Sequence, residues 1–138
     1  MSFELRGHTA DVGVAATGDT QDEVFAAVAD GLAAAMCEEW PAGVGERFSF
    51  AVEAEGREAL LFDYLDQLIY ERDVRGVLPV DNRASVTRTD DETWRVEASA
   101  RGVPLDVVEA REVKAVTYSE LSLEETPDGW QAYVVFDV

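Results

Sequence analysis

The sequence contains little cysteine and no long apolar segment. Its single cysteine, Cys37, can form neither a disulfide within the chain nor a thiolate metal cluster. No apolar run approaches the roughly 18–20 residues that a membrane-spanning helix needs. The residues from Met1 to Leu5 do not place an apolar segment after basic residues, as a secretory signal peptide would. These absences predict a soluble domain in the cytoplasm.

Basic residues are also scarce. The chain has 11 Lys and Arg against 29 Asp and Glu, a formal net charge of −18, and Lys114 is its one lysine. No basic cluster offers the footprint that phosphates require, so we expect no direct binding of nucleic acid. The acids are spread along the whole chain, which suits a salt-rich cytoplasm and predicts a halophilic source. Because solvation accounts for most of these carboxylates, an acidic cluster is weak evidence of a site.

The length and apolar content predict one folded domain over residues 1–138. With 138 residues, 47% of them hydrophobic, the chain has the size of a single core, which is roughly 100–150 residues. This apolar content excludes intrinsic disorder despite the high charge. The sequence has no internal repeat, linker or low-complexity segment.

Two segments carry the apolar periodicity of amphipathic helices. Thr20 and Glu23 form a capping-box pattern, which predicts that a helix begins there and ends before Pro41. Apolar residues recur every three or four positions in both segments, so each is predicted to bury one face. They are Val24, Phe25, Val28, Leu32, Ala35 and Met36 in the first segment and Leu61, Tyr64, Leu65, Leu68 and Ile69 in the second.

Alternating apolar and polar residues predict strands elsewhere in the chain. The predicted strands are residues 3–6, 12–17, 48–54, 84–89, 94–101, 113–124 and 130–138. Gly76 and Pro79 are expected to open a loop or an edge strand, and residues 102–104 are expected to break the sheet. Segregated helices and antiparallel strands indicate an α+β fold, with an antiparallel or mixed β-sheet and two amphipathic helices.

Polar groups lie beside two of the predicted strand ends. His8 and Asp11 occupy a short break between strands and are candidates to bind a metal ion or a proton; an Asx turn around Asp11 is the alternative. Asp137 precedes the terminal carboxylate of Val138, and Ca²⁺, Mg²⁺ and Mn²⁺ prefer such oxygen ligands; a solvated strand end is the alternative. If Asp11 and the terminus meet, a cation would offset their repulsion.

Two further residues are weaker candidates. Lys114 is a compact ammonium whose pKa is readily tuned, in a chain that otherwise uses arginine, although one surviving lysine is equally ordinary. Cys37 is expected to be a small packed residue beside Met36. The chain has no phosphate-cradling loop, GxSxG, HExxH or EF-hand motif. The residues alone therefore predict an acidic α+β domain with a candidate hard-metal site.

Four segments, in order, resemble the archease family. They are residues 8–13 (HTADVG), 61–70 (LFDYLDQLIY), 112–118 (EVKAVTY) and 134–138 (VVFDV). The resemblance extends from residue 3 to the C-terminus and implies a compact α+β fold with two helices. It implies a non-catalytic accessory factor of the RtcB-type RNA ligase, which joins tRNA exon halves. Archeases promote the guanylylation of that ligase by GTP, restore its multiple turnover and widen the nucleotides that it accepts.

The resemblance also implies which residues matter. The family's metal site falls on Asp11, Asp137 and Val138, the last through a main-chain or terminal oxygen. The implied ion is Ca²⁺, with Mg²⁺ or Mn²⁺ as other hard cations. His8 and Lys114 are implied to contact the partner or a nucleotide.

Two other functions stay open on the sequence. A chaperone-like modulator of another RNA-processing enzyme, such as a tRNA methyltransferase, would bind its partner stoichiometrically and without dependence on Asp11 or metal. A metal-dependent hydrolase acting through Asp11 and His8 would need a substrate pocket and a defined base.

The chain departs from the family at one position directly after the third segment. Archaeal relatives often carry histidine where this chain has Ser119, and Ser119 cannot replace that histidine as a ligand or a base.

Overall fold

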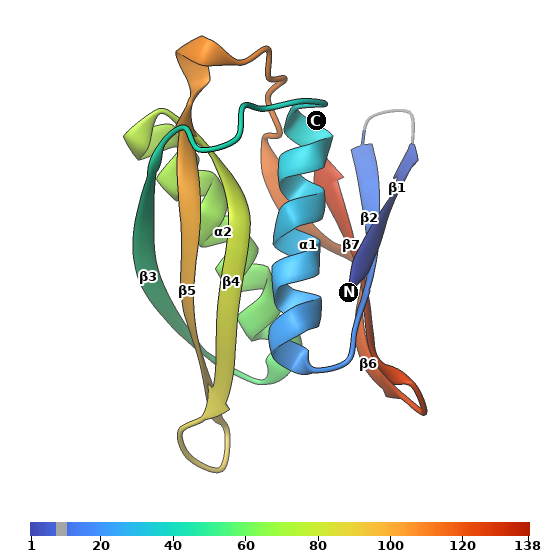
Figure 1. Ribbon diagram of the computed structural model, residues 1–138. Helices are drawn as coiled ribbons and strands as arrows, with labels where there is room; N and C mark the ends of the chain where they lie inside the picture. Colours follow the sequence, from blue (N-terminus) through green and yellow to red (C-terminus); the bar gives the residue numbers. More distant parts are fainter. Residues whose placement is uncertain (8–10) are drawn as a thin grey trace.

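The computed structural model describes residues 1–7 and 11–138 (Figure 1). Over these residues the elements are β1 (Ser2–Gly7), β2 (Asp11–Gly18), α1 (Gln21–Met36), β3 (Glu46–Glu55), α2 (Arg57–Arg75), β4 (Val77–Arg88), β5 (Thr93–Pro104), the 3₁₀ helix η1 (Leu105–Val107), β6 (Ala115–Thr126) and β7 (Gly129–Asp137). Neither α-helix in this part of the chain combines the length and the apolar character that a membrane crossing requires.

The strands form two antiparallel sheets, where the sequence predicted one. Sheet A has the strand order β1-β2-β7-β6, and sheet B has the order β3-β5-β4. Both helices lie between the sheets, with α1 packed against β2 and β4 and α2 packed against β3 and β6 (Figure 1). The core fills this middle layer, so each sheet keeps an outer face that no helix covers. The predicted α+β class is confirmed.

Helix α1 begins at the predicted cap. The Glu23 N–H donates to Thr20 Oγ1 at 3.2 Å, and the Glu23 carboxylate accepts from the Asp19 N–H at 2.9 Å. The capping box is therefore present with one difference: the Glu23 carboxylate accepts from the N–H of Asp19, one residue before the N-cap residue Thr20 that usually donates this bond. The helix ends at Met36, and Cys37 is extended. All the apolar residues predicted for this helix are buried: Val24, Phe25, Val28, Leu32, Ala35 and Met36.

Helix α2 carries the clearest predicted face and ends at a glycine. Its five predicted core residues are all buried: Leu61, Tyr64, Leu65, Leu68 and Ile69. Gly76 follows the helix with a φ of 65°, the left-handed conformation that glycine adopts without steric cost. The ring of Tyr64 lies 5.8 Å from Phe25 of α1 and 5.9 Å from Phe50 of β3, centroid to centroid. This aromatic cluster joins both helices to sheet B.

Sheet B is more continuous than the sequence predicted. Of the two alternatives for the segment after Gly76, the edge strand is confirmed, since β4 begins at Val77 and includes Pro79. An edge strand tolerates proline because one side of it makes no ladder bonds. The predicted break at residues 102–104 is wrong, because β5 continues to Pro104 and pairs there with residues 77–79.

The segment between η1 and β6 is fastened to the C-terminal end of α1. This strap, residues 108–114, carries Arg111, whose Nε donates to the Ala35 carbonyl and whose backbone N–H donates to the Met36 carbonyl, both at 2.7 Å. The last carbonyls of a helix have no partner within the helix, so Arg111 satisfies two groups that would otherwise need water.

Arg72 of α2 fastens the same strap from the other side. It is only 7% exposed, and its Nη1 donates to the Val113 carbonyl at 2.7 Å. Its Nη2 lies 2.8 Å from the Asp73 carboxylate. The Val113 carbonyl thus bonds α2 and not a neighbouring strand, and β6 begins at Ala115, opposite Asp137, and not at residue 113 as predicted.

We expect Arg72→Met to lower the free energy of unfolding by about 1–3 kcal/mol, because the buried Val113 carbonyl would lose its donor. Arg95→Met is the control, since Arg95 makes one long contact of 3.4 Å with an exposed glutamate, and its loss should change stability by no more than about 0.5 kcal/mol. Urea unfolding curves measure both changes. Equal losses in the two variants would contradict the prediction.

Candidate functional site

The ends of three strands meet at one end of sheet A. In the register of the sheet, Asp11 at the start of β2 is the partner of Asp137 at the end of β7. Asp137 is in turn the partner of Ala115 at the start of β6. Two residues from opposite ends of the chain therefore lie side by side, with Cβ atoms about 4.5–5.5 Å apart for directly opposed antiparallel partners. The two predicted acids belong to one place in the fold.

Both carboxylates project from the outer face of sheet A. Side chains of directly opposed residues share a face, and successive residues alternate between faces. The next row of the sheet, Val12, Phe136 and Val116, is buried in the core between the sheets, at exposures of 7%, 0% and 6%. The acidic row must therefore point to the opposite face. The buried apolar row adjacent to the acids along the strands, on the inner face, holds the backbone of the acidic row in place.

The donor set fits a hard cation. Asp11 is half-buried, with its Oδ1 atom out of contact with solvent, whereas Asp137 is exposed. Across residues 1–7 and 11–138, no three His, Cys, Asp or Glu side chains gather into a metal-binding group. An ion at this row would thus take two carboxylates and complete its shell with main-chain, terminal or solvent oxygens, which Ca²⁺ accepts readily.

Val138 and Lys114 flank the acidic pair. The side chain of Val138 packs against the core, which fixes the residue after Asp137 and its main-chain oxygens. The Lys114 N–H donates to the Asp137 carbonyl at 2.8 Å, and the Lys114 side chain is exposed. Three predicted site residues and the single lysine therefore lie at one end of the sheet. The backbone of Lys114, which carries a positive side chain, therefore lies beside the two acidic residues.

The remaining sequence candidates lie elsewhere. His8 falls outside the residues that the structure describes. Cys37 is 4% exposed, and its thiol donates to the Glu39 carbonyl at 3.0 Å, so the predicted packed role is confirmed. Ser119 is exposed in an irregular stretch of β6, where the register with β7 shifts between residues 117 and 122.

One tyrosine on the outer face of sheet A was not predicted from the sequence. Tyr133 lies on the same face of β7 as Asp137, and a Cβ at Gly13 would lie 2.2 Å from its Oη. Arg6 of β1 sits over the Tyr133 ring, 5.6 Å from its centroid. Strand alternation would have placed Tyr133 and Asp137 on one face of β7, about 13 Å apart along the strand. Only the cross-strand register could show that Gly13 leaves room for the ring.

We expect Gly13→Ala to destabilise the protein by about 1–3 kcal/mol, because the new methyl group overlaps the Tyr133 hydroxyl. In the Tyr133→Ala background the same substitution should cost much less, since the obstacle is gone. Thermal unfolding of the two single variants and the double variant measures this coupling. If the losses of stability in the two single variants simply add in the double variant, the overlap between the methyl group and the Tyr133 hydroxyl is not the reason for glycine at position 13.

Comparisons with known proteins identify the family. The sequence profile of the Archease protein family matches residues 3–138. Protein archease of Thermococcus gammatolerans is 38% identical over 140 residues, which cover 99% of this chain and 98% of that protein. The corresponding protein of Pyrococcus abyssi is 33% identical over 140 residues, with the same coverage of 99% and 98%.

Two solved structures share the fold. The solution structure of protein 1598 of Methanobacterium thermoautotrophicum has a TM-score of 0.81 at 26% identity and covers 99% of this chain and 98% of its own. The crystal structure of a Thermotoga maritima protein, named "an archease, possible chaperone", has a TM-score of 0.63 at 23% identity, with 98% of each chain covered, and supports the fold alone. By its sequence profile and its relatives, this chain belongs to the archease family.

Proposed function

We propose that this protein is the accessory activator of an RtcB-type tRNA-splicing RNA ligase. In this role it promotes guanylylation of the ligase by GTP, supports multiple turnover and widens the nucleotides accepted, while the ligase carries out the chemistry. The observation that carries the proposal is the row formed by Asp11 and Asp137, with Lys114 bonded beside it. Membership of the archease family makes the ligase the partner to test.

The site has the form of a protruding contact and not of a reaction chamber. Asp137 and Lys114 are exposed at the end of a sheet, and the buried row of Val12, Phe136 and Val116 supports them. Rigid charged groups in such a place suit insertion into a partner's cleft. A basic cleft that binds nucleotide phosphates and metal would complement the two carboxylates, and Lys114 would face the phosphates.

The residues that would hold Ca²⁺, or Mg²⁺ or Mn²⁺ in its place, are Asp11, Asp137 and Val138. Carboxylates of Asp11 and Asp137 supply the charge, and a main-chain or terminal oxygen of Val138 supplies a neighbouring ligand. A bound divalent cation would contribute positive charge and exchangeable coordination positions at the contact. With so few protein ligands the ion would be held weakly enough to exchange with a partner.

The overall charge fits a basic partner in a salty cytoplasm. A net charge of −18 accelerates encounter with a positively charged protein at low salt, and this gain falls as salt screens the charges. We place the protein in the cytoplasm of a halophile on the same composition. Its assays therefore belong in buffers of molar salt.

A chaperone-like role is the second candidate. It is supported by the exposed apolar residues Tyr70 and Val74 on α2 and Tyr118 on β6, which are 57%, 63% and 58% exposed. The name of the Thermotoga maritima protein, "possible chaperone", points the same way. A client such as a tRNA methyltransferase would be kept soluble through these apolar groups, without any need for Asp11.

We expect the wild-type protein to raise the turnover of ligase guanylylation with GTP in high salt, and Asp11→Ala to abolish that effect without loss of fold. Asp128→Ala is the matched control, because Asp128 is an exposed acid in the turn at the opposite end of β7, and it should stimulate like wild type. Equal stimulation by all three proteins would keep the partner and reject the acidic row. No stimulation by any of them would favour the chaperone role.

We expect Ca²⁺ to raise the thermal unfolding midpoint of the wild type, because a ligand that binds only the folded state stabilises it; the gain is about 2.7 kcal/mol at a hundredfold excess over the dissociation constant. Asp137→Asn should remove most of the shift. Asp128→Asn should retain it, which separates site binding from general screening of the acidic surface. A shift of the same size in both variants would refute a site at Asp137.

A further inference from the structure

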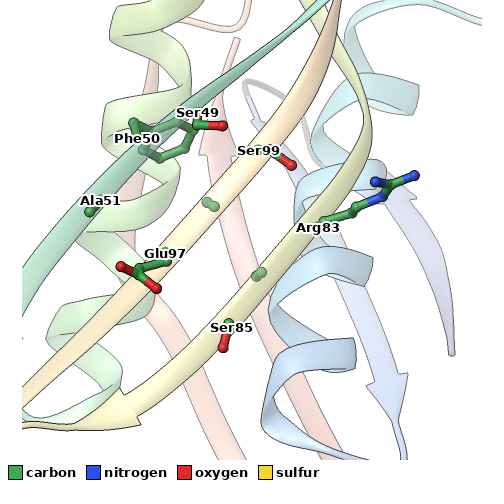
Figure 2. A pocket seen from close by; sticks show the side chains of 9 residues that line it. Ser49, Phe50, Ala51, Arg83, Ser85, Glu97 and Ser99 are labelled. Carbon is green, nitrogen blue, oxygen red and sulfur yellow. The ribbon is translucent and has the colours of Figure 1, made fainter.

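The outer face of sheet B carries a shallow depression in an unusual electrostatic setting. It has a volume of about 580 Å³, and the described residues that line it include Ser49 of β3, Ser85 of β4, and Glu97 and Ser99 of β5. Figure 2 shows the serine side chains spread over three neighbouring strands and Glu97 on β5, with Arg83 extending from β4 to the side away from β5. The floor is made by serine and alanine, so the backbone of the sheet lies open to a ligand of modest size.

Three arginines gather at one end of this depression. Arg47 is the register partner of Arg101, and Arg83 is the partner of Ser99 in the next row. Arg101 is compensated by Asp81, whose carboxylate lies 2.8 Å from its Nε. Among the described residues, no carboxylate oxygen lies within 4.0 Å of Arg47 or Arg83. Neither guanidinium group therefore forms an ion pair with the described residues, although Arg47 Nη2 donates to the Asp81 carbonyl at 2.9 Å.

The pKa of Arg47 is lowered by its surroundings. Burial lowers the pKa of its guanidinium first, and the positive charges of Arg83 and Arg101 lower the pKa further, against the opposing effect of Asp81. This chain has 29 acidic residues and 11 basic ones, so two guanidinium groups without an ion-pair partner among the described residues are against the trend of its composition. A bound anion would supply the missing charge.

The hydrogen-bonding groups around the pair define the anion. Arg47 Nη1 donates to Ser99 Oγ at 2.9 Å, and Ser49 is the register partner of Ser99, so two hydroxyls lie beside the guanidinium groups. Guanidinium and hydroxyl donors in such a group match the three oxygens of a phosphate monoester. Glu97 lies two residues along β5 from Ser99, a separation of about 6.8 Å, and its carboxylate, 3.4 Å from Arg95 Nη2, has further oxygen lone pairs that can accept from hydroxyl groups of a ligand.

We propose that the outer face of sheet B binds a small phosphate monoester of a polyol, such as a sugar phosphate. The phosphate rests on Arg47, Arg83 and the hydroxyls of Ser49 and Ser99, and hydroxyls of the same ligand reach Glu97. The helices separate this face from the acidic row of sheet A (Figure 1), so the site is distinct from the proposed ligase contact and goes beyond it.

Titration of the ¹⁵N-labelled protein followed by NMR tests the proposal, with ribose 5-phosphate, inorganic phosphate and ribose as the three probes. We expect ribose 5-phosphate to shift amide signals of residues 49, 83, 97 and 99, phosphate to bind more weakly, and ribose to have no effect. Arg83→Gln should raise the dissociation constant of ribose 5-phosphate about tenfold, since it removes charge-assisted bonds. Glu97→Gln should weaken ribose 5-phosphate without affecting phosphate.

Arg88→Gln is the control for net charge. Arg88 lies on the same strand but donates to backbone carbonyls of Asp90 and Asp91 in the β4–β5 turn, so its loss should leave binding unchanged. Equal weakening by Arg83→Gln and Arg88→Gln would show non-specific attraction and overturn the site. Signals that move for a single-stranded RNA but not for ribose 5-phosphate would also overturn it. Well-dispersed spectra of both variants establish that they fold.

Discussion

The register that joins β7 to its two neighbours is the constraint on which the candidate site depends. β7 lies between β2 and β6, and its buried alternate residues, including Val134 and Phe136, set which face points to α1. A shift by one residue would send the whole apolar set to solvent, which makes the register strongly specified. The same register that buries Phe136 beside Val12 brings Asp137 beside Asp11. The hydrophobic core and the acidic row are therefore two results of one pairing.

The local parts of the fold were readable from the sequence, because their determinants lie within a few residues of one another. The cap at Thr20 and the buried stripe of α2 are examples, and both are confirmed. The continuation of β5 through Gly102 was not readable, because it depends on pairing with β4, about 25 residues earlier in the chain. Glycine and proline near a strand end suggested a break that this distant pairing overrides.

The site shows the same limit. Spacing alone could not bring together Asp11 and Asp137, since the two strands come from opposite ends of the chain. The resemblance to archeases predicted their meeting, and the sheet register confirms that they lie side by side. Whether they bind metal stays a prediction. Tyr133 was missed because its position over β2 depends on the space that Gly13 leaves there.

Several arginines in this acidic chain make contacts with carbonyl groups or aromatic rings, in some cases beside an ion pair. Arg111 bonds a helix carbonyl, Arg72 bonds a strap carbonyl, and Arg57 lies 5.3 and 5.1 Å from the ring centroids of Trp94 and Trp130. Carbonyl and ring contacts depend on short-range geometry, and salt weakens them less than it weakens exposed ion pairs. Such contacts would persist in the salt-rich cytoplasm that the acidic composition predicts.

The fastening of the strap has a consequence for how the acidic row meets another molecule. Lys114 ends the strap and bonds β7, while Arg111 and Arg72 tie the strap to both helices. The strand ends therefore belong to the same cooperative unit as the core and do not fray independently of it. A binding surface that is already ordered loses little conformational entropy on association. In the free protein the backbone of Asp137 and Lys114 is thus already ordered, so the contact proposed for these residues would require little further ordering of the main chain.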